Sequence, residues 1–348
     1  MEKYQITVGM PVYGVEKYIR KSISSVLNQN FDNMEILCVD DLGPDYSMDI
    51  VREIKATHPK GDKIRIITQP KNMGCWAARN RIIDESQGKY LFLIDSDDYI
   101  AEDTLKLLYD TAEKNQAETV YGSVESVKED GTPANFSSGD MKLPYKELLK
   151  PNELASYANQ NLHATLYNFI WNVLIRIDFI RNNHLRFQNT RYGDDIIFET
   201  DMQPLVNRAV LLPNITYYYV LRPGSLSNFQ IREKIKLEEI NTYIKNYNYI
   251  KNQVQNLKDK PYYEIRCAKV LIYMFYIIAG AIKNRDKIYP HLTDKMICEA
   301  MSHPIQLHEI LKFRQYRNLN ILFSLMAKLP PFLAVKCYTL IGKRKHLL

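Results

Sequence analysis

The feature that most constrains the fold is the regular alternation of short apolar runs with amphipathic segments over the first third of the chain. The apolar runs have the length of buried strands, which we expect at residues 6–12, 34–39, 63–68, 90–94 and 119–127. Between them, apolar residues recur at helical spacing, which predicts helices at residues 15–27, 46–57, 77–86 (closed by Gly88) and 104–115. Such alternation is typical of an α/β fold with a mostly parallel sheet and right-handed crossovers.

Three carboxylates follow the fourth expected strand directly. The apolar run Tyr90 to Ile94 leads into Asp95, Asp97 and Asp98. Ligands of open α/β sheets bind beyond the carboxyl ends of the strands, and hard divalent cations such as Mg²⁺ take oxygen ligands together with phosphates. We therefore expect a metal that holds a diphosphate here. The alternative is a solvated acidic turn in which Asp98 or a neighbour caps the next helix.

Two further polar segments are expected at the same edge of the sheet. Asp40 and Asp41 end the second expected strand, and the turn Met10 to Gly14 follows the first. This turn lacks the glycine pattern of a dinucleotide-binding fold, and the chain lacks a phosphate-binding P-loop. Phosphates would therefore be held by metal and side chains rather than by a glycine-rich loop.

The charge is concentrated at the end of the chain. The net charge is +6, yet residues 310–348 carry eight Lys or Arg and no acid, so the remainder has a charge of 6 − 8 = −2. This argues against a nucleic-acid-binding core. Residues 319–348 alternate apolar runs with basic residues, which suits a helix on an anionic bilayer surface. Packing back on the rest of the chain with a solvated basic end is the alternative.

The five cysteines are scattered without a C-x-x-C pair, which indicates a reducing compartment and no structural zinc. The amino terminus runs straight into a strand, and no uninterrupted apolar run of membrane-spanning length is evident. We expect a cytoplasmic protein, with the tail offering peripheral contact to the cytoplasmic face of an inner membrane.

Four segments, in order, resemble the inverting glycosyltransferases of family 2, which have the GT-A fold. They are Ile6 to Ile19, Val26 to Asp41, the N-x-G-x-x-x-A-R-N segment Asn72 to Asn80, and the D-x-D segment Ile94 to Asp98. The resemblance covers roughly the first two-thirds of the chain. One departure is Leu42-Gly43, where the family usually has Gly-Ser after the paired aspartates.

The resemblance implies roles on the donor side. Pro11, Val12 and Tyr13 would line the nucleotide pocket, and Asp41 or Asp40 would accept a hydrogen bond from the base, most plausibly uracil. Arg79 would lie near the nucleotide or diphosphate, the alternative being a surface helix residue that pairs with Asp84 or Glu85. In the D-x-D segment, Asp97 would be the principal ligand of Mn²⁺ or Mg²⁺, and its neighbours Asp95, Ser96 and Asp98 would hold metal, ribose or donor sugar. The positive charge of such a metal stabilises a leaving diphosphate.

An inverting transfer also needs a base for the acceptor hydroxyl. Asp194 and Asp195 resemble the family's E-D motif, in which the second acid, here Asp195, is the catalytic base; capping of a helix is the alternative. Trp171 and Asn172 resemble an acceptor-side W-N segment, although Trp171 could equally be core. Arg222, which begins a turn that resembles the family's basic turn, would approach the diphosphate.

The domain limits follow from this reading. We expect a catalytic domain at residues 1–229, with a nucleotide-sugar-binding half (1–127) and an acceptor half (128–229), and a helical region at 230–348. The expected function is metal-dependent, inverting transfer of a hexose or N-acetylhexosamine from a UDP-sugar to a saccharide or lipid-linked saccharide, in bacterial surface polysaccharide or lipopolysaccharide biosynthesis. The alternatives are a sugar-phosphate nucleotidyltransferase and a non-catalytic saccharide-binding or membrane scaffold protein. No nucleic acid partner is expected.

Overall fold

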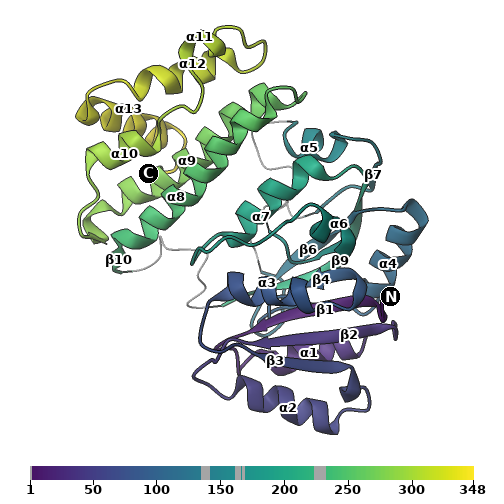
Figure 1. The fold of residues 1–348 in the computed structure, drawn as a ribbon. Helices are drawn as coiled ribbons and strands as arrows, with labels where there is room; N and C mark the ends of the chain where they lie inside the picture. The colour runs from purple at the N-terminus through teal and green to yellow at the C-terminus, as the bar shows by residue number, and fades with distance from the viewer. Residues whose placement is uncertain (1, 135–141, 161–165, 167–168, 223–232) are drawn as a thin grey trace. The chain divides into compact units, whose positions relative to one another are not determined.

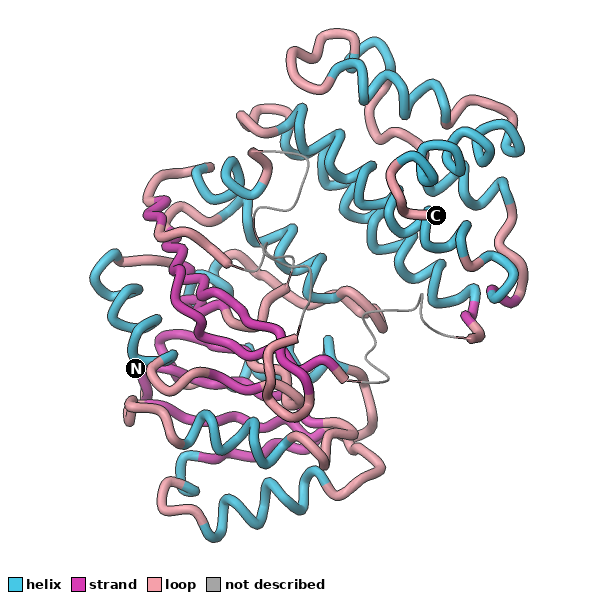
Figure 2. Tube along the Cα trace, turned by 180° about the vertical axis from the view of Figure 1, so that it is seen from behind, coloured by secondary structure: helices cyan, strands magenta, loops and turns pink. Residues whose placement is uncertain are grey.

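The computed structural model describes residues 2–134, 142–160, 166, 169–222 and 233–348. The chain divides into two compact units. Unit 1 comprises Met1–Leu154 and Leu166–Gly224, and unit 2 comprises Ala155–Thr165 and Ser225–Leu348. The expected boundary between residues 229 and 230 lies outside the described residues. Figure 2 shows that the long strands belong to unit 1 and that unit 2 is built almost entirely from helices.

Unit 1 is built on a nine-stranded sheet in the order β3-β2-β1-β4-β8-β6-β9-β5, with β7 paired to β9. The strands β1, β2, β3, β4, β6 and β9 run in one direction, and β5, β7 and β8 run in the other. The expected α/β fold with a mostly parallel sheet is thus confirmed. The strands are β1 (Tyr4–Val12), β2 (Met34–Asp40), β3 (Ile64–Thr68), β4 (Gly88–Leu93), β5 (Tyr99–Ile100), β6 (Thr119–Lys128), β7 (Lys146–Leu148), β8 (Val173–Arg176) and β9 (Ala209–Leu221).

The helices of unit 1 form where apolar residues recur on one face. In α1, for example, Ile19, Ile23 and Val26 are buried at helical spacing. Helix α3 packs on β1 and β2 (Figure 1), and a side chain at Gly9 would overlap Ile82 of α3, so the glycine permits close packing. The helices are α1 (Ile19–Leu27), α2 (Ser47–Thr57), α3 (Cys75–Glu85), α4 (Thr104–Asn115), α6 (Ile177–Asn182) and α7 (Asp194–Met202), with 3₁₀ turns at Gly61–Lys63 and Gln203–Leu205.

The predicted role of Gly88 is wrong. Helix α3 ends at Glu85, and Gly88 is the first residue of β4 rather than a helix stop. A Cβ atom at Gly88 would lie 2.4 Å from the backbone nitrogen of Thr7. Only glycine therefore lets β4 begin against β1, and this close approach decides the residue type.

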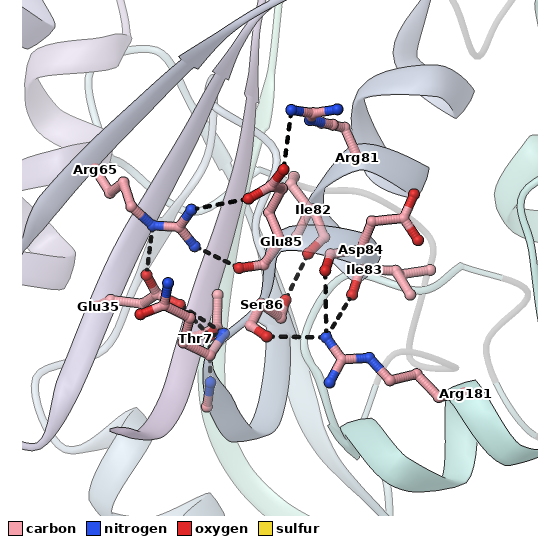
Figure 3. A network of polar contacts seen from close by, with 12 residues as sticks. Thr7, Glu35, Arg65, Arg81, Ile82, Ile83, Asp84, Glu85, Ser86 and Arg181 are labelled. Carbon is pink, nitrogen blue, oxygen red and sulfur yellow. Dashed lines mark hydrogen bonds and ion pairs between the residues drawn. The ribbon is translucent and has the colours of Figure 1, made fainter. Parts of the chain in front are cut away.

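A polar network fixes the start of β4 (Figure 3). Thr7 donates from Oγ1 to Glu35 at 2.7 Å and accepts from the backbone N–H of Gly88 at 2.9 Å. Glu35 is buried and is neutralised by Arg65, whose Nε lies 2.9 Å from its carboxylate. Because a buried charge is tolerated when it is paired and hydrogen-bonded, the network joins β1, β2 and β3 to the start of β4. The network thereby helps to determine where the carboxyl end of β4 lies.

Unit 2 is organised around α9 (Tyr263–Lys283), on which α8, α10, α12 and α13 pack. Its elements are β10 (Ile235–Lys236), α8 (Leu237–Gln253), β11 (Ile288–Tyr289), α10 (Asp294–Ala300), α11 (Leu307–Ile310), α12 (Arg317–Met326) and α13 (Pro331–Arg344), with 3₁₀ turns at Val254–Leu257 and Arg285–Lys287. The short helix α5 (Glu153–Ala158) crosses from unit 1 into unit 2. Within unit 2, Ala155 packs with Tyr262 and Ile265.

Helix α9 is long and apolar enough to cross a membrane by length and composition, although charged residues interrupt its apolar run. However, 72% of its apolar window is buried inside the protein. It also carries Lys269, which is buried and donates from Nζ to the carbonyl of Ala158, and burial lowers the pKa of this amine to about 7. These features are typical of the core helix of a globular unit.

Candidate functional site

The three aspartates after β4 gather into one acidic cluster. Asp98 donates its backbone N–H to the carbonyl of Asp95 at 3.0 Å, so the chain turns tightly as it leaves the strand. One carboxylate oxygen from each of Asp95, Asp97 and Asp98 lies within 4.8 Å of the others. Asp95 and Asp97 are partly exposed, whereas Asp98 is buried. Crowded oxygen donors of this kind match the ligand preference of Mg²⁺ or Mn²⁺.

Asp98 is fixed by β9 on the neighbouring part of the sheet. Its Oδ2 accepts from the hydroxyl of Tyr217 at 2.8 Å, and its Oδ1 accepts from the backbone N–H of Val220 at 2.7 Å. Burial, together with the charges of Asp97 and Asp95, raises the pKa of Asp98 well above its ordinary value. Both oxygens are thus already engaged with protein, which suits a supporting role better than direct metal ligation.

Asp97 faces a cation from the end of β9. The Nε of Arg222 donates to Oδ2 of Asp97, and the guanidinium lies 5.5 Å from the ring centroid of Tyr18. Burial and the charge of Asp95 raise the pKa of Asp97, and Arg222 partly offsets them. The structure thus brings Arg222 to the expected metal ligand. The rest of its turn, residues 223–227, lies outside the described residues.

Arg79 joins the acidic cluster to the expected base. Its guanidinium is buried and donates to Asp95 at 2.8 Å and to Asp194 at 2.9 Å. Arg79 is therefore not the surface helix residue of the alternative reading; on α3, it is Arg81 that pairs with Glu85. The Nε atom of the Arg79 guanidinium is buried and has no hydrogen-bond partner among the described residues. A single cation thus links residues that are 99 positions apart in sequence (194 − 95).

Asp194 and Asp195 form the first turn of α7, after Gly193 in a left-handed conformation with φ of 68°. Oδ1 of Asp195 accepts the backbone N–H of Ile196 at 2.8 Å. Burial, and then the charge of Asp194, raises the pKa of Asp195 to about 7, although Arg79 opposes this. A carboxylate with this pKa is suited to accept a proton near neutral pH. The helix N-terminus also favours these acids, as the alternative reading expected.

Asp40 and Asp41 are buried at the end of β2 and are engaged with nearby backbone. The carboxylate oxygens of Asp41 accept the N–H groups of Met73 and Gly74, each at 2.8 Å. Asp40 accepts the N–H of Leu42 at 2.9 Å. Asp41 therefore orders the loop that leads into α3, which is the segment that carries Arg79.

The other expected donor-side residues differ in exposure. Tyr13 is 51% exposed after β1, whereas Val12 is buried and Pro11 is partly buried. Ser96 is buried within the acidic turn. Of these residues, Tyr13 is the one with a large surface open to a ligand.

The two acceptor-side residues lie mainly in the interior. Trp171 is 6% exposed and stacks on Phe169 and on Tyr217, with ring centroids 3.5 Å and 4.5 Å away. Asn172 is fully buried; its amide donates to the carbonyl of Gly122 at 2.9 Å and accepts from Thr216 at 2.7 Å. In this structure Asn172 ties β6 to β9 and so fixes the position of Trp171.

Two residues of this region were not singled out from the sequence. Tyr217 contacts both Asp98 and Trp171, and its position in the run Tyr217-Tyr-Tyr219 was the available signal. Glu199 is fully buried one turn after Asp195 on α7, where it accepts from Tyr121 at 2.9 Å. Burial raises the pKa of Glu199 to about 8. Its spacing from Asp195 was visible, but its burial was not.

Comparisons with known proteins agree with this architecture. The profile described as Glycosyl transferase family 2 matches residues 7–172. An uncharacterized glycosyltransferase of Haemophilus influenzae is 28% identical over 69% of this chain and 88% of its own length. The cholesterol galactosyltransferase of Borreliella burgdorferi is 26% identical over 94% and 93%. The crystal structure of S. aureus TarS 1–349 in complex with UDP-GlcNAc matches with a TM-score of 0.68 at 18% identity, covering 93% of this chain and 90% of that one.

Proposed function

Since this chain belongs to glycosyl transferase family 2 and is a glycosyltransferase with a GT-A fold, we propose that it transfers one sugar from a UDP-sugar to an acceptor hydroxyl with inversion at the anomeric carbon. The observation that carries this proposal is the convergence of the acidic cluster, Arg79 and the Asp194–Asp195 pair at one edge of the sheet. The UDP-GlcNAc bound by the structural relative TarS supports UDP as the leaving group.

We assign the donor half to the acidic cluster. Asp97, with Asp95, would hold Mn²⁺ or Mg²⁺, which supplies positive charge to the diphosphate. Arg222 adds a guanidinium beside Asp97 that suits phosphate oxygens. Asp98 holds the turn in place through Tyr217 and Val220. Tyr13 is exposed where it can cover the nucleotide.

We assign the base to Asp195. As the acceptor oxygen forms its bond to the anomeric carbon, the bond from that carbon to the diphosphate oxygen breaks, and the hydroxyl proton passes to the Asp195 carboxylate. The pKa of about 7 leaves a substantial ionised fraction at neutral pH and makes the acid strong enough to be regenerated. Asp194 keeps its neighbour in place through the ion pair with Arg79.

We propose that the acceptor is a saccharide or lipid-linked saccharide of a bacterial surface polysaccharide or lipopolysaccharide. The name of the Borreliella relative gives a sterol acceptor, so a sterol belongs in any acceptor panel. Five free cysteines fit the reducing, cytoplasmic location in which we place the reaction.

The decisive experiment measures UDP release from a panel of UDP-sugars with Mn²⁺, with Mg²⁺ or with EDTA. Wild type should hydrolyse one donor slowly, and both EDTA and Asp97→Ala should abolish this hydrolysis. Asp110→Ala, an exposed aspartate on α4, serves as the control and should keep full activity. Asp195→Asn should keep donor binding and lose transfer by at least about 100-fold, the contribution of a general base.

Two results would overturn the proposal. Full activity of Asp97→Ala in EDTA would exclude the metal assignment. Turnover of GDP- or dTDP-sugars in preference to every UDP-sugar would exclude uracil as the base.

A further inference from the structure

Large hydrophobic side chains are exposed preferentially at the C-terminal end of unit 2. Among the described residues, seven such side chains are exposed up to residue 310 and eight are exposed in residues 311–348. The eight are Leu311, Tyr316, Leu322, Leu325, Leu329, Phe332, Leu333 and Leu340. Scattered exposed apolar residues are ordinary, but a concentration of this kind marks an interaction surface.

On α12 the exposed apolar residues share one face. Leu322 and Leu325 are three positions apart, and Leu329 follows four positions later, just after the helix ends. This spacing places Leu322 and Leu325 on one side of the helix, and Leu329 is exposed just beyond its end. Phe323 and Met326 of the same helix are buried in unit 2. The outward side is therefore apolar although the helix already has a separate buried face.

Helix α13 repeats this arrangement. Its buried face carries Ala334, Val335 and Tyr338, and it packs on α9 and α10. Its outward face carries Phe332 and Leu340, which are 55% and 68% exposed. Two basic residues lie on the same side: Lys336 is four positions after Phe332, and Lys343 is three positions after Leu340.

The formal charges carried by these two helices and their flanking residues all have one sign. Residues 310–348 contain eight basic residues and no Asp or Glu. All eight basic side chains are exposed, and none forms an ion pair with another residue that the structure describes. They are Lys312, Arg314, Arg317, Lys328, Lys336, Lys343, Arg344 and Lys345.

We propose that the outward faces of α12 and α13, with their flanking basic residues, bind the surface of an anionic lipid bilayer. Leucine and phenylalanine side chains would enter the boundary of the acyl chains while lysine and arginine bind the lipid phosphates. A second copy of this chain fits poorly, because it would bring two sets of unpaired cations together. The inference does not depend on which sugar or acceptor the enzyme uses.

The test is co-sedimentation of the full-length protein with lipid vesicles. One set contains phosphatidylcholine alone, and the other contains about 30% phosphatidylglycerol. Wild type should bind the anionic vesicles at least about 10-fold more tightly and should lose most of this preference at about 0.5 M salt, where screening is strong. Equal binding to both vesicle types, or no binding to either, would overturn the proposal.

Two sets of substitutions separate the apolar from the charged contribution. Leu325→Gln with Phe332→Gln and Leu340→Gln should weaken binding about 10-fold or more, because three anchors are lost. Lys336→Gln with Lys343→Gln and Arg344→Gln should remove the preference for anionic lipid. All six residues are exposed, so circular dichroism and donor hydrolysis should stay at wild-type levels.

Matched controls use exposed residues elsewhere. Leu205→Gln with Tyr145→Gln controls for apolar surface, and Lys106→Gln with Lys114→Gln and Lys295→Gln controls for charge. Both control proteins should bind as wild type does. If they lose binding equally, the effect is one of total charge or hydrophobicity and the assigned surface is wrong. Normal vesicle binding by a protein without donor turnover would challenge the proposed reaction alone.

Discussion

Arg79 shows how one buried side chain can hold two parts of a site. Its guanidinium pairs with Asp95 after β4 and with Asp194 at the start of α7. Buried ion pairs of this kind contribute little to net stability compared with apolar packing, but removal of one partner leaves uncompensated charge. The bridge is therefore best understood as a positioning device for the acids on either side.

Substitution of Arg79 by Met tests this view. Asp95 and Asp194 would be left close together without their cation, so the free energy of unfolding should fall by about 3 kcal/mol. Urea denaturation followed by circular dichroism measures the change. Arg81→Met is the matched control, since Arg81 lies on the exposed side of the same helix and its one ion pair among the described residues is with Glu85. It should change stability by less than about 1 kcal/mol. Equal losses in the two variants would contradict the bridge.

The second prediction at this scale concerns pH. Asp195 must be ionised to accept a proton, so kcat/KM of the wild type should rise with pH through an inflection near 7. Asp194→Asn removes a negative charge that helps to raise this pKa and leaves Arg79 to lower it, so the inflection should move to lower pH. Measurements of kcat/KM between about pH 5 and about pH 9 locate the inflection in each protein. Asp178→Asn, on the exposed side of α6, should leave the inflection unchanged.

At the scale of elements, α7 is tied to β6 through Glu199 as well as to α3 through Arg79. Tyr121 of β6 and Gln203 both donate to Oε1 of Glu199, while its Oε2 is buried without a partner among the described residues. A carboxyl group with one unpartnered buried oxygen favours the protonated form. The helix that presents the expected base is thus anchored by an acid that is mostly neutral at pH 7.

This anchoring has a measurable pH dependence. The pKa of Glu199 is raised from 4.5 to about 8, so the folded protein keeps a proton that the unfolded chain releases between these values. Stability from this group is complete below pH 4.5 and decreases as pH rises toward about 8, by at most roughly 1.4 kcal/mol per pH unit. Glu199→Gln should remove this decrease. The urea midpoints of wild type and Glu199→Gln, measured at several pH values, test this prediction. If the midpoints of the two proteins change with pH in parallel, Glu199 is not the source of the decrease.

Sequence patterns predicted the elements best where the chain is regular. The first four strands and their helices follow from apolar periodicity, because the pattern that specifies each of them is local to its own segment. The two-residue strand β5 and the antiparallel strand β8 were not resolved by periodicity, since pairing across distant segments determines them. Gly88 was misjudged for the same reason: its contact with Thr7 is a tertiary one.

The site residues likewise divide into features that the sequence predicted and features that it did not. The acids of 95–98 and 194–195 were visible as local motifs next to expected element ends. The pairing of Arg79 with Asp194 was not, because no local pattern reports which segments a fold brings together. The sequence also could not show that the side chains of Asn172 and Asp98 form hydrogen bonds with buried residues of the protein.

At the scale of the whole molecule, the chain enters the helical unit twice. Residues 155–165 belong to unit 2 although unit 1 continues from residue 166 to 224. Within unit 2, Ala155 packs with Tyr262 and Ile265, and Ala158 accepts a hydrogen bond from Lys269. The two units are therefore connected by more than one passage of the backbone, and cutting the chain once does not separate them cleanly.

A truncation tests this organisation. A chain ending at Gly224 keeps residues 155–165 but loses the helices that Ala155 and Ala158 contact, so it should bind a hydrophobic dye and aggregate more than the full protein. Replacing 155–165 by a Gly/Ser linker of equal length in the same truncated chain should reduce both effects. Dye fluorescence and size-exclusion chromatography measure them. If the linker variant aggregates as much as its parent, the segment is not the cause.

The Arg79 bridge also bears on how such a sequence can change over evolutionary time. A substitution at residue 79 leaves Asp95 and Asp194 without their cation, whereas a substitution at 95 or 194 leaves the guanidinium with one partner. Single steps at these positions are penalised, while compensated changes are tolerated. Positions 79, 95 and 194 should therefore covary among related sequences, so that the residue at one position predicts the residues at the other two.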